Sequence, residues 1–176
     1  MNNILEAMKT RRSCRDFKPE MLPQEIIDQI CEAGTYAPTG MNRQSPVIIA
    51  VKDKVLRDKL AVMNAQIMGK PSDFDPFYGA PVVLIVLANR EMQNTYLYDG
   101  SLVMANLMLA AHALGVGSCW IHRAKEEFQT DECKAILREL GIEGDYEGIG
   151  HCVIGYENGP HREAPPRKEG YVHQIG

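Results

Sequence analysis

The chain has 176 residues, 45% of them apolar, and a formal net charge of -4 at pH 7. This length and composition suit one compact domain over residues 1–176, and the acidic balance argues against a nucleic-acid or membrane-surface binder. The five cysteines are widely spaced and no apolar run approaches the roughly 20 residues of a membrane span, which excludes a disulfide framework and a membrane helix. Isolated thiols and the lack of a signal-peptide core favour a cytoplasmic protein.

Helices and strands are predicted to alternate along the chain in an α+β order around a small sheet. The helix predictions rest on apolar residues at helical spacing between capping residues, and the strand predictions on short β-branched runs. Prolines and glycines mark the connections, most clearly at 36–46 and 69–81. In chain order the expected elements are helix 3–11, helix 23–34, strand 47–51, helix 53–67, strand 82–88, helix 95–114, strand 117–121, helix 130–141 and strand 151–156.

The predicted helix 95–114 lies in the most apolar stretch of the chain, GSLVMANLMLAAHALGVG. It is too short for a membrane span and includes Asn106 and His112, so we expect a helix buried on most sides. One thin sheet cannot cover that much apolar surface. We therefore predict that a second subunit covers the rest, which makes the protein a homodimer.

Three arginines and a serine crowd into RRSCRDF (11–17), directly after the first predicted helix. Cations there can simply complement the helix dipole, a contribution of about 0.3–1 kcal/mol each at an exposed site. They can instead hold an anion, because arginine forks suit phosphate oxygens. Neither GxGxxG nor GxxxxGK[ST] occurs, so a phosphate held by arginine side chains would suit a mononucleotide cofactor.

A second basic group lies near the end of the chain, in PHREAPPRKEGYVH (160–173). One interpretation is a solvated, partly frayed terminus. The other is a stiff segment anchored by Tyr171 and Val172, which brings Arg167 and Lys168 back to the same phosphate. The residues alone leave both interpretations open.

Four segments, in order, resemble the FMN-dependent nitroreductase family. RRSCRDF resembles its opening Arg-x-Ser-x-Arg segment, and APTGMNRQSP (37–46) its Pro-Ser-x-x-Asn-x-Gln loop, with Thr39 in place of serine. GVGSCWIH (115–122) resembles the strand after its central helix, and GYENGP…PPRK (155–168) its closing Gly-Tyr…Arg-Lys tail. The matches extend from residue 11 to residue 168 and so cover nearly the whole chain.

The resemblance implies an α+β sandwich with a central, mostly antiparallel sheet flanked by helices. It also implies an intertwined homodimer with two FMN sites at the subunit interface. The implied FMN contacts are Arg11, Arg167 and Lys168 at the phosphate; Arg12 and Ser13 near the ribityl chain and phosphate; Arg15 at the pyrimidine end; Pro38, Thr39 and Asn42 from the other subunit; and Trp120, Ile121 and His122 beside the dimethylbenzene ring and N5.

The activity implied by the resemblance is FMN-dependent NAD(P)H oxidoreduction by a ping-pong cycle. NADH or NADPH would reduce the flavin, and a nitroaromatic, quinone or enone would oxidise it in the same pocket, to which the short segment 64–80 would contribute. The flavin carries the chemistry, so no catalytic side chain is expected. Alternatives are reductive dehalogenation or flavin destruction, and a non-enzymatic module that binds a flavin, a phosphorylated metabolite or an acidic partner.

A few single residues carry further expectations. Cys14 lies among arginines, which should favour its thiolate. Glu126 and Glu127 are expected to begin a solvated helix, and Asp73 and Asp75 to face solvent. The five histidines show no metal-ligand spacing, so no metal site is expected.

Overall fold

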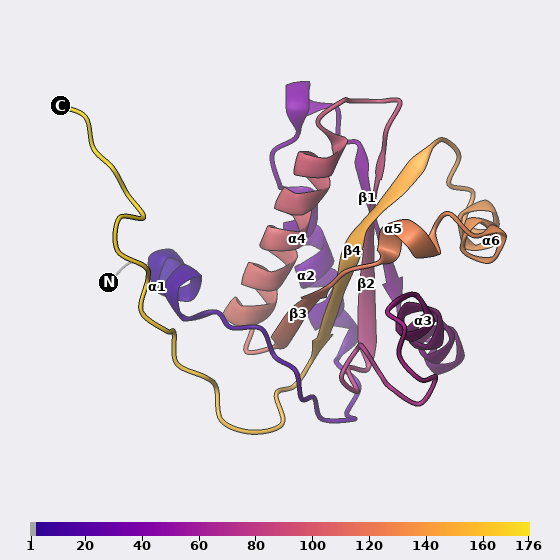
Figure 1. The fold of residues 1–176 in the computed structure, drawn as a ribbon, viewed down its shortest axis with the longest axis horizontal. Coiled ribbons are helices and arrows are strands. Elements are labelled where there is room, and N and C mark those ends of the chain that lie inside the picture. Colours follow the sequence, from indigo (N-terminus) through magenta and orange to yellow (C-terminus); the bar gives the residue numbers. More distant parts are fainter. Residues whose placement is uncertain (1–2) are drawn as a thin grey trace.

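The structure is a computed structural model that describes residues 3–176 (Figure 1). Its elements follow the predicted order closely. They are α1 (Asn3–Thr10), α2 (Gln24–Thr35), the 3-10 turn η1 (Gly40–Asn42), β1 (Pro46–Val51), α3 (Lys54–Ile67), β2 (Val82–Asn89), α4 (Tyr96–Ala113), β3 (Gly117–Ile121), α5 (Ala124–Glu127), α6 (Asp131–Glu139) and β4 (Tyr146–Gly155).

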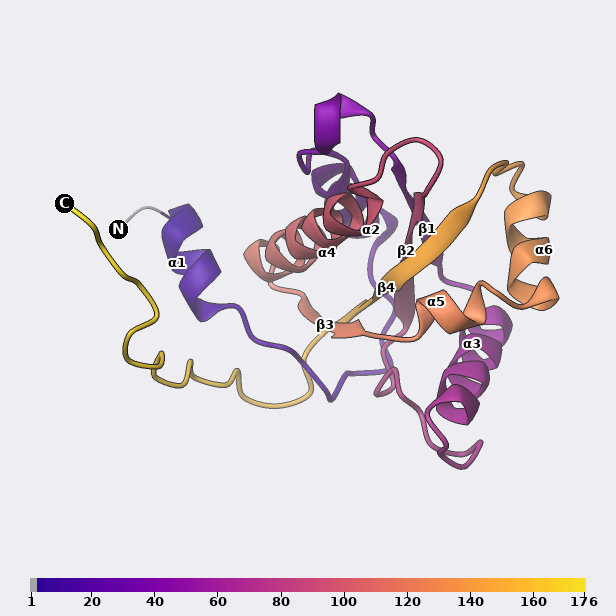
Figure 2. The same ribbon diagram turned by 45° about the horizontal axis from the view of Figure 1, so that its top comes forward.

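The strands form one sheet in the order β1-β2-β4-β3, and every neighbouring pair is antiparallel. Helices α2 and α4 cover one face of the sheet, and α3, α5 and α6 cover the other (Figures 1 and 2). The predicted α+β sandwich with a mostly antiparallel sheet is therefore confirmed. Within residues 3–176, no helix is both long and apolar enough to cross a lipid bilayer.

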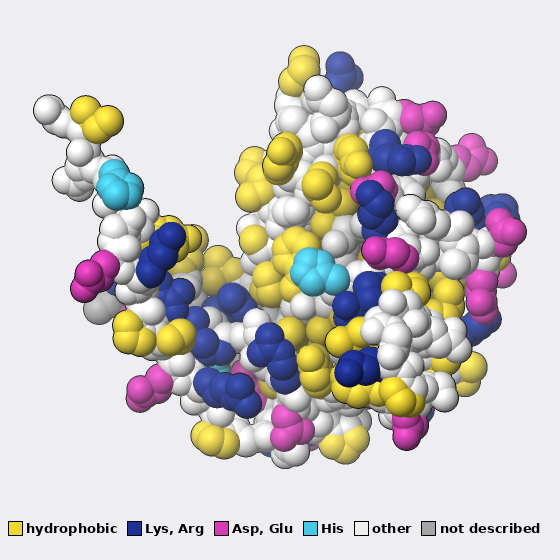
Figure 3. All heavy atoms as spheres, in the orientation of Figure 1, with side chains coloured by type: hydrophobic (Ala, Val, Ile, Leu, Met, Phe, Trp, Pro, Cys, Tyr) yellow, Lys and Arg dark blue, Asp and Glu magenta, His cyan; other side chains and the backbone are white. Residues whose placement is uncertain are grey.

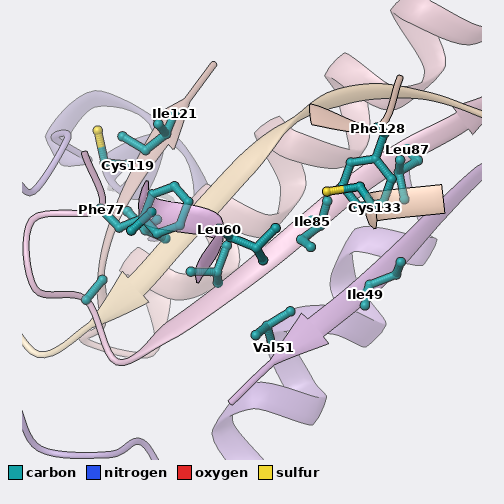
Figure 4. Close-up of a cluster of buried hydrophobic side chains, with 14 of the residues drawn as sticks. Ile49, Val51, Leu60, Phe77, Ile85, Leu87, Cys119, Ile121, Phe128 and Cys133 are labelled. Atoms are coloured by element: carbon teal, nitrogen blue, oxygen red, sulfur yellow. The ribbon is translucent and has the colours of Figure 1, made fainter. Parts of the chain in front are cut away.

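The central strand β2 separates two hydrophobic cores, because successive side chains of a strand point to opposite faces. Val82, Leu84 and Val86 pack with α2 and α4. Val83, Ile85 and Leu87 point to the other face, where they meet the second core. Figure 4 shows this second core, with the labelled side chains Leu60, Phe77, Phe128 and Cys133.

Strand β4 begins at Tyr146, five residues before the predicted start, and the short helix α5 ends at Glu127, where the sequence suggested that a solvated helix begins. Both differences have one cause, which is a close approach of α5 to β4. A Cβ atom on Gly148 would lie 2.2 Å from the backbone carbon and oxygen of Ala124, so only glycine allows this contact. Glycines read as loop residues in a sequence, whereas here they let the strand pass under a helix.

Helix α1 and residues 157–176 stand away from the sandwich and together form what we call the arm (Figures 1 and 2). The apolar side chains of α1 have little cover: Ile4, Leu5 and Met8 are all more than half exposed. The outer face of α4 is also apolar and exposed at Leu97 and Leu102. In Figure 3, hydrophobic side chains line the hollow between arm and body, and Lys and Arg side chains gather where the two join.

Candidate functional site

The basic segment 11–17 runs beside β3, the edge strand of the sheet. Ser13 forms a parallel bridge with Ser118, and the N–H of Cys14 donates to the carbonyl of Ser118 over 2.8 Å. The N–H of Lys18 then donates to the carbonyl of Tyr156 over 2.9 Å. These backbone bonds hold an extended segment against the sheet edge, where its side chains can act together.

Arg11 is the first cation of this segment. Its backbone N–H still closes α1, donating to the carbonyl of Ala7 over 3.0 Å. Its Nη1 is buried and has no acceptor among residues 3–176. A buried, unsatisfied donor on a charged group costs on the order of 1–3 kcal/mol or more, so this position suits an anionic ligand that would supply the acceptor.

Arg12 behaves as the helix-dipole interpretation predicts. Its guanidinium donates to the carbonyls of Lys9 and Arg11, which are free carbonyls at the C-terminal end of α1. The cluster therefore divides: Arg12 caps the helix through its two Nη atoms, although its buried Nε has no acceptor among residues 3–176, whereas Nη1 of Arg11 has no acceptor there and Arg15 is exposed.

A cavity of about 230 Å³ opens between the basic segment and the chain that follows β4. Acidic and basic side chains both line the cavity, and the three basic ones are arginines. It is lined by Arg12, Ser13, Cys14, Arg15, Asp16, Glu157, Asn158, Gly159, Pro160 and Arg162.

Cys14 is buried beside this cavity. Burial raises the pKa of its thiol, and the carboxylates of Glu157 and Asp16 act in the same direction. The expectation that the arginines favour the thiolate is therefore wrong: loss of solvent is the largest influence on this pKa, and the opposing influence is the hydrogen bond to the Asp16 carbonyl.

The start of the C-terminal segment is pinned to the ends of α1 and α4 through His161. Its Nε2 donates to the carbonyl of Thr10 over 2.9 Å, and its Nδ1 faces a carboxylate oxygen of Glu157 at 3.0 Å. Its ring stacks on that of His112, with centroids 5.3 Å apart, and His112 Nε2 lies 2.8 Å from the hydroxyl of Thr10. The two ends of the chain therefore meet beside the basic segment.

Arg167 and Lys168, farther along the tail, are exposed and make local contacts. Arg167 donates to the carbonyl of Pro165 over 2.7 Å, and Lys168 lies 5.4 Å from the ring centroid of Tyr171. Their return to the phosphate stays a prediction.

The loop that carries Pro38, Thr39 and Asn42 is held by one buried carboxylate, that of Asp99 in the first turn of α4. Asp99 accepts hydrogen bonds from the N–H of Gly40 over 3.0 Å and from the hydroxyl of Ser45 over 3.1 Å. The loop is strained, because three non-glycine residues adopt left-handed conformations. These are Met41 with φ 52°, Asn42 with φ 53° and Gln44 with φ 52°.

Sequence reasoning missed Asp99. The available signal was an acidic residue in the first turn of an otherwise apolar helix.

Helix α4 separates this loop from the basic segment. Asp99, near the N-terminal end of α4, holds the loop, whereas His112, near the other end, contacts Thr10. The 18 residues of α4 span about 27 Å, and Figure 1 shows the two segments at opposite ends of the helix. Within one chain, Pro38, Thr39 and Asn42 therefore do not approach Arg11.

Trp120, Ile121 and His122 lie where β3 ends, and they differ in exposure. Trp120 is half-buried, and its indole nitrogen packs so closely that a Cβ on Gly150 would lie 2.4 Å from it. Ile121 points into the core shown in Figure 4, which leaves only its backbone available to a ligand. His122 is exposed, with its ring centroid 5.8 Å from that of Trp120.

The prediction that Glu127 is solvated is wrong. Its side chain is fully buried and pairs with the equally buried His151, with Oε2 2.7 Å from Nε2. Its Oε1 accepts a hydrogen bond from Asn64 over 2.6 Å. The expectation fails because α5 lies directly on β4, so that the side chain points into the protein.

Asp75 is likewise not simply solvent-facing. It accepts hydrogen bonds from the guanidinium of Arg57 over 2.5 Å and from the N–H groups of Phe77 and Gly79 over 2.9 and 2.8 Å. This network shapes segment 64–80 and sends Phe77 into the core, where it meets His151 edge-on. Phe77 therefore cannot line a substrate pocket.

The comparisons with known proteins agree with this geometry. A sequence model of the Nitroreductase family matches residues 8–156. The chain therefore belongs to the nitroreductase family, which confirms the predicted family and its fold.

Two solved structures are similar over essentially the whole chain. A nitroreductase with bound FMN from Bacteroides fragilis NCTC 9343 has a TM-score of 0.88 and 28% identity, with 100% of both chains covered. A nitroreductase with bound FMN from Desulfitobacterium hafniense DCB-2 has a TM-score of 0.85 and 27% identity, covering 99% of this chain and 100% of that one.

A sequence relative is the FMN reductase (NADPH) of Bacillus subtilis (strain 168). It is 28% identical over 141 residues, which is 72% of this chain and 57% of the relative. The chain thus spans little more than half of that enzyme.

Proposed function

We propose that the protein is an FMN-dependent NAD(P)H oxidoreductase whose flavin lies between two copies of the chain. The observation that carries this proposal is the buried Nη1 of Arg11, which has no acceptor among residues 3–176 and lies in a basic segment beside the sheet edge. Membership of the nitroreductase family and the FMN-bound structures that resemble the chain support the same cofactor.

The donors fit FMN in number and kind. A phosphate offers several anionic oxygens, and Arg11 can donate to them as a fork, with the hydroxyl of Ser13 and later Arg167 and Lys168 as further donors. Arg15 at the pyrimidine end would stabilise the negative charge that a reduced flavin carries near N1 and C2=O. Trp120 would cover the ring, and Pro38, Thr39 and Asn42 of the second copy would enclose it.

When bound, FMN supplies the redox chemistry, accepting hydride from NADH or NADPH and passing electrons to a nitroaromatic, quinone or enone. The chain has to bind the cofactor, orient it and leave one face open to both substrates. Alternating use of one open face is the basis of the proposed ping-pong cycle.

The second copy is needed on two grounds. Asp99, which holds the loop 38–46, and His112, which contacts Thr10 next to Arg11, lie about 20 Å apart along α4, too far for one ligand to meet both segments within one chain. In addition, α1 and α4 border an apolar hollow of about 380 Å³, lined in part by Ile4, Leu109 and Ala113. A partner that fills this hollow would bury the exposed apolar side chains of α1 as well.

Purification tests the proposal. We expect a yellow dimer that binds added FMN and is bleached by NADH or NADPH, and whose colour returns with a nitroaromatic or quinone. The double variant Arg11→Ala with Arg167→Ala should lose FMN and keep its fold, as followed by flavin fluorescence and circular dichroism. A folded, colourless monomer without affinity for FMN would overturn the proposal and favour a non-enzymatic binding module.

A further inference from the structure

Glu127 and His151 form a buried hydrogen-bonded pair at the centre of the molecule, away from the basic segment. Both side chains are fully buried, with 0% exposure, and Oε2 lies 2.7 Å from Nε2. Nδ1 of His151 has no partner among residues 3–176. Burying ionisable groups has a large desolvation cost, so such a pair is weak evidence of stabilisation and calls for another explanation.

Asn64, on α3, connects this pair to the end of β3. Its amide Nδ2 donates to Glu127 over 2.6 Å and to the backbone carbonyl of His122 over 2.9 Å. Its Oδ1 accepts a hydrogen bond from Nε of Arg123 over 2.8 Å. Both polar atoms of this fully buried amide are thus used to hold the turn that follows β3.

The turn needs holding, because Arg123 adopts a left-handed conformation with φ 81°. Such a conformation is unfavourable for a residue with a side chain and persists only where its surroundings enforce it. Three contacts do so: Asn64 binds the His122 carbonyl, Asn64 binds the Arg123 side chain, and the N–H of Glu127 donates to the Arg123 carbonyl over 3.0 Å.

These contacts fix the direction of one peptide group. In a trans peptide the C=O and N–H point in opposite directions. Because the carbonyl of His122 points inward to Asn64, the N–H of Arg123 points away from the buried network. Within residues 3–176 that N–H has no protein acceptor, so it is available to a ligand.

We propose that Asn64, anchored by the Glu127–His151 pair, is a positioning residue that fixes the peptide between His122 and Arg123 and thereby sets the redox behaviour of the flavin, and not the affinity for FMN. The proposal rests on the proposed function, in which the end of β3 lies beside N5. The phosphate donors belong to a different segment, so cofactor affinity and flavin reactivity should respond to different substitutions.

The variant Asn64→Leu tests this, because leucine has a similar volume and no polar atoms. In the FMN-loaded enzyme we expect the rate constant of flavin reduction at saturating NADH or NADPH to fall about 10- to 100-fold. The midpoint potential and the visible spectrum of bound FMN should change, and the Kd for FMN should stay within about threefold of wild type.

The matched control is Leu60→Ala, one turn earlier on α3 and buried in the core. It should lower the melting temperature without changing the potential or spectrum of bound FMN. If Asn64→Leu does not fold, Asn64→Ser serves the same purpose, since its short side chain cannot reach both His122 and Arg123.

The variant Glu127→Gln separates geometry from charge. Glutamine can still accept from Asn64 and can donate to a neutral His151, so we expect flavin reduction within about threefold of wild type. A change as large as that of Asn64→Leu would contradict a positioning role and indicate that the buried charge itself acts on the flavin.

A readout on the apoprotein distinguishes this inference from the proposed function. Limited trypsin digestion well below the melting temperature should cut after Arg123 about tenfold faster in Asn64→Leu than in wild type or Leu60→Ala. If wild type binds no FMN, the proposed function fails whatever trypsin shows. If wild type binds FMN and Asn64→Leu matches it in potential, spectrum and cleavage, only the inference fails.

Discussion

The two ends of α4 carry two halves of one candidate site, and they are built in different ways. At the C-terminal end, the basic segment has ordinary backbone geometry, held to β3 and β4 by main-chain bonds, and offers charged side chains. At the N-terminal end, the loop 38–46 has three left-handed residues and is tied to α4 at two points by the carboxylate of Asp99. One half is specified by charge and the other by backbone shape, so they should fail differently when mutated.

The largest effect is expected where the shape of a whole loop depends on one side chain. Asp99→Ala removes the acceptor of Gly40 and Ser45 and leaves buried donors unsatisfied, so the free energy of unfolding should fall by about 3 kcal/mol. Urea denaturation followed by circular dichroism measures this. Asp99→Asn, which keeps one oxygen acceptor, should lose less; equal losses in the two variants would show that the loop does not depend on these bonds.

Substitutions in the basic segment should weaken FMN binding without lowering the stability of the protein. Arg11→Ala removes a donor to the proposed phosphate, and we expect the Kd for FMN to rise about 10- to 100-fold, which corresponds to a charged hydrogen bond. Its stability should not fall, because the guanidinium Nη1 is buried without a partner among residues 3–176. Fluorescence titration and urea denaturation test the two parts.

Arg12→Ala is the matched control for Arg11→Ala and should show the reverse pattern. Arg12 caps α1, so its loss should lower stability by up to about 1 kcal/mol and change the Kd for FMN much less. Equal effects of the two variants on FMN binding would contradict the division of the cluster.

The smallest effect concerns the attachment of the tail. The bonds to the Thr10 carbonyl and to Glu157 raise the pKa of His161 above its usual value, while the charge of Arg12 opposes them. Its stabilising contribution is thus fully present below the unfolded pKa of about 6.5 and is lost as pH rises through the higher folded pKa. Because the side chain is partly exposed, we expect less than about 1 kcal/mol.

Burial lowers the pKa of His112, the stacking partner of His161, and its contribution therefore has the opposite sign. It is present above the unfolded pKa and is lost as pH falls through the folded value. The contribution of His161 is isolated by comparing wild type with His161→Gln at pH 5.5 and at pH 9. The measurement is the rate of proteolysis within residues 162–168. If wild type is protected relative to His161→Gln by no more at pH 5.5 than at pH 9, the predicted contribution of His161 is wrong.

Local patterns predicted most of the fold. The apolar run of β2 is buried on both faces, and Asp53, the first residue of the predicted helix 53–67, caps α3 by accepting from the N–H of Leu56 over 2.8 Å. Gly115, with φ 73°, follows α4 directly after the end of the predicted helix 95–114. Such features depend on neighbours in sequence, which is why they can be read without a structure.

The buried polar network could not be read in that way. Glu127 meets Asn64 across 63 positions and His151 across 24, and a glutamate in a polar stretch is usually solvated. Gly148 was a hint in the sequence that α5 packs closely on β4. The hint can be interpreted only once Ala124 is known to lie against that glycine. Long-range contacts between polar residues leave no periodic pattern along the chain.

The arm has a consequence for how this protein responds to dilution. Its apolar residues Ile4, Leu5 and Met8 are solvent-exposed on the single chain, so in the proposed dimer the partner completes a hydrophobic core that one chain leaves unfinished. Folding and assembly would then be one equilibrium. The melting temperature should rise with protein concentration, and lowering the concentration should act on this protein as a mild denaturant does on a monomer.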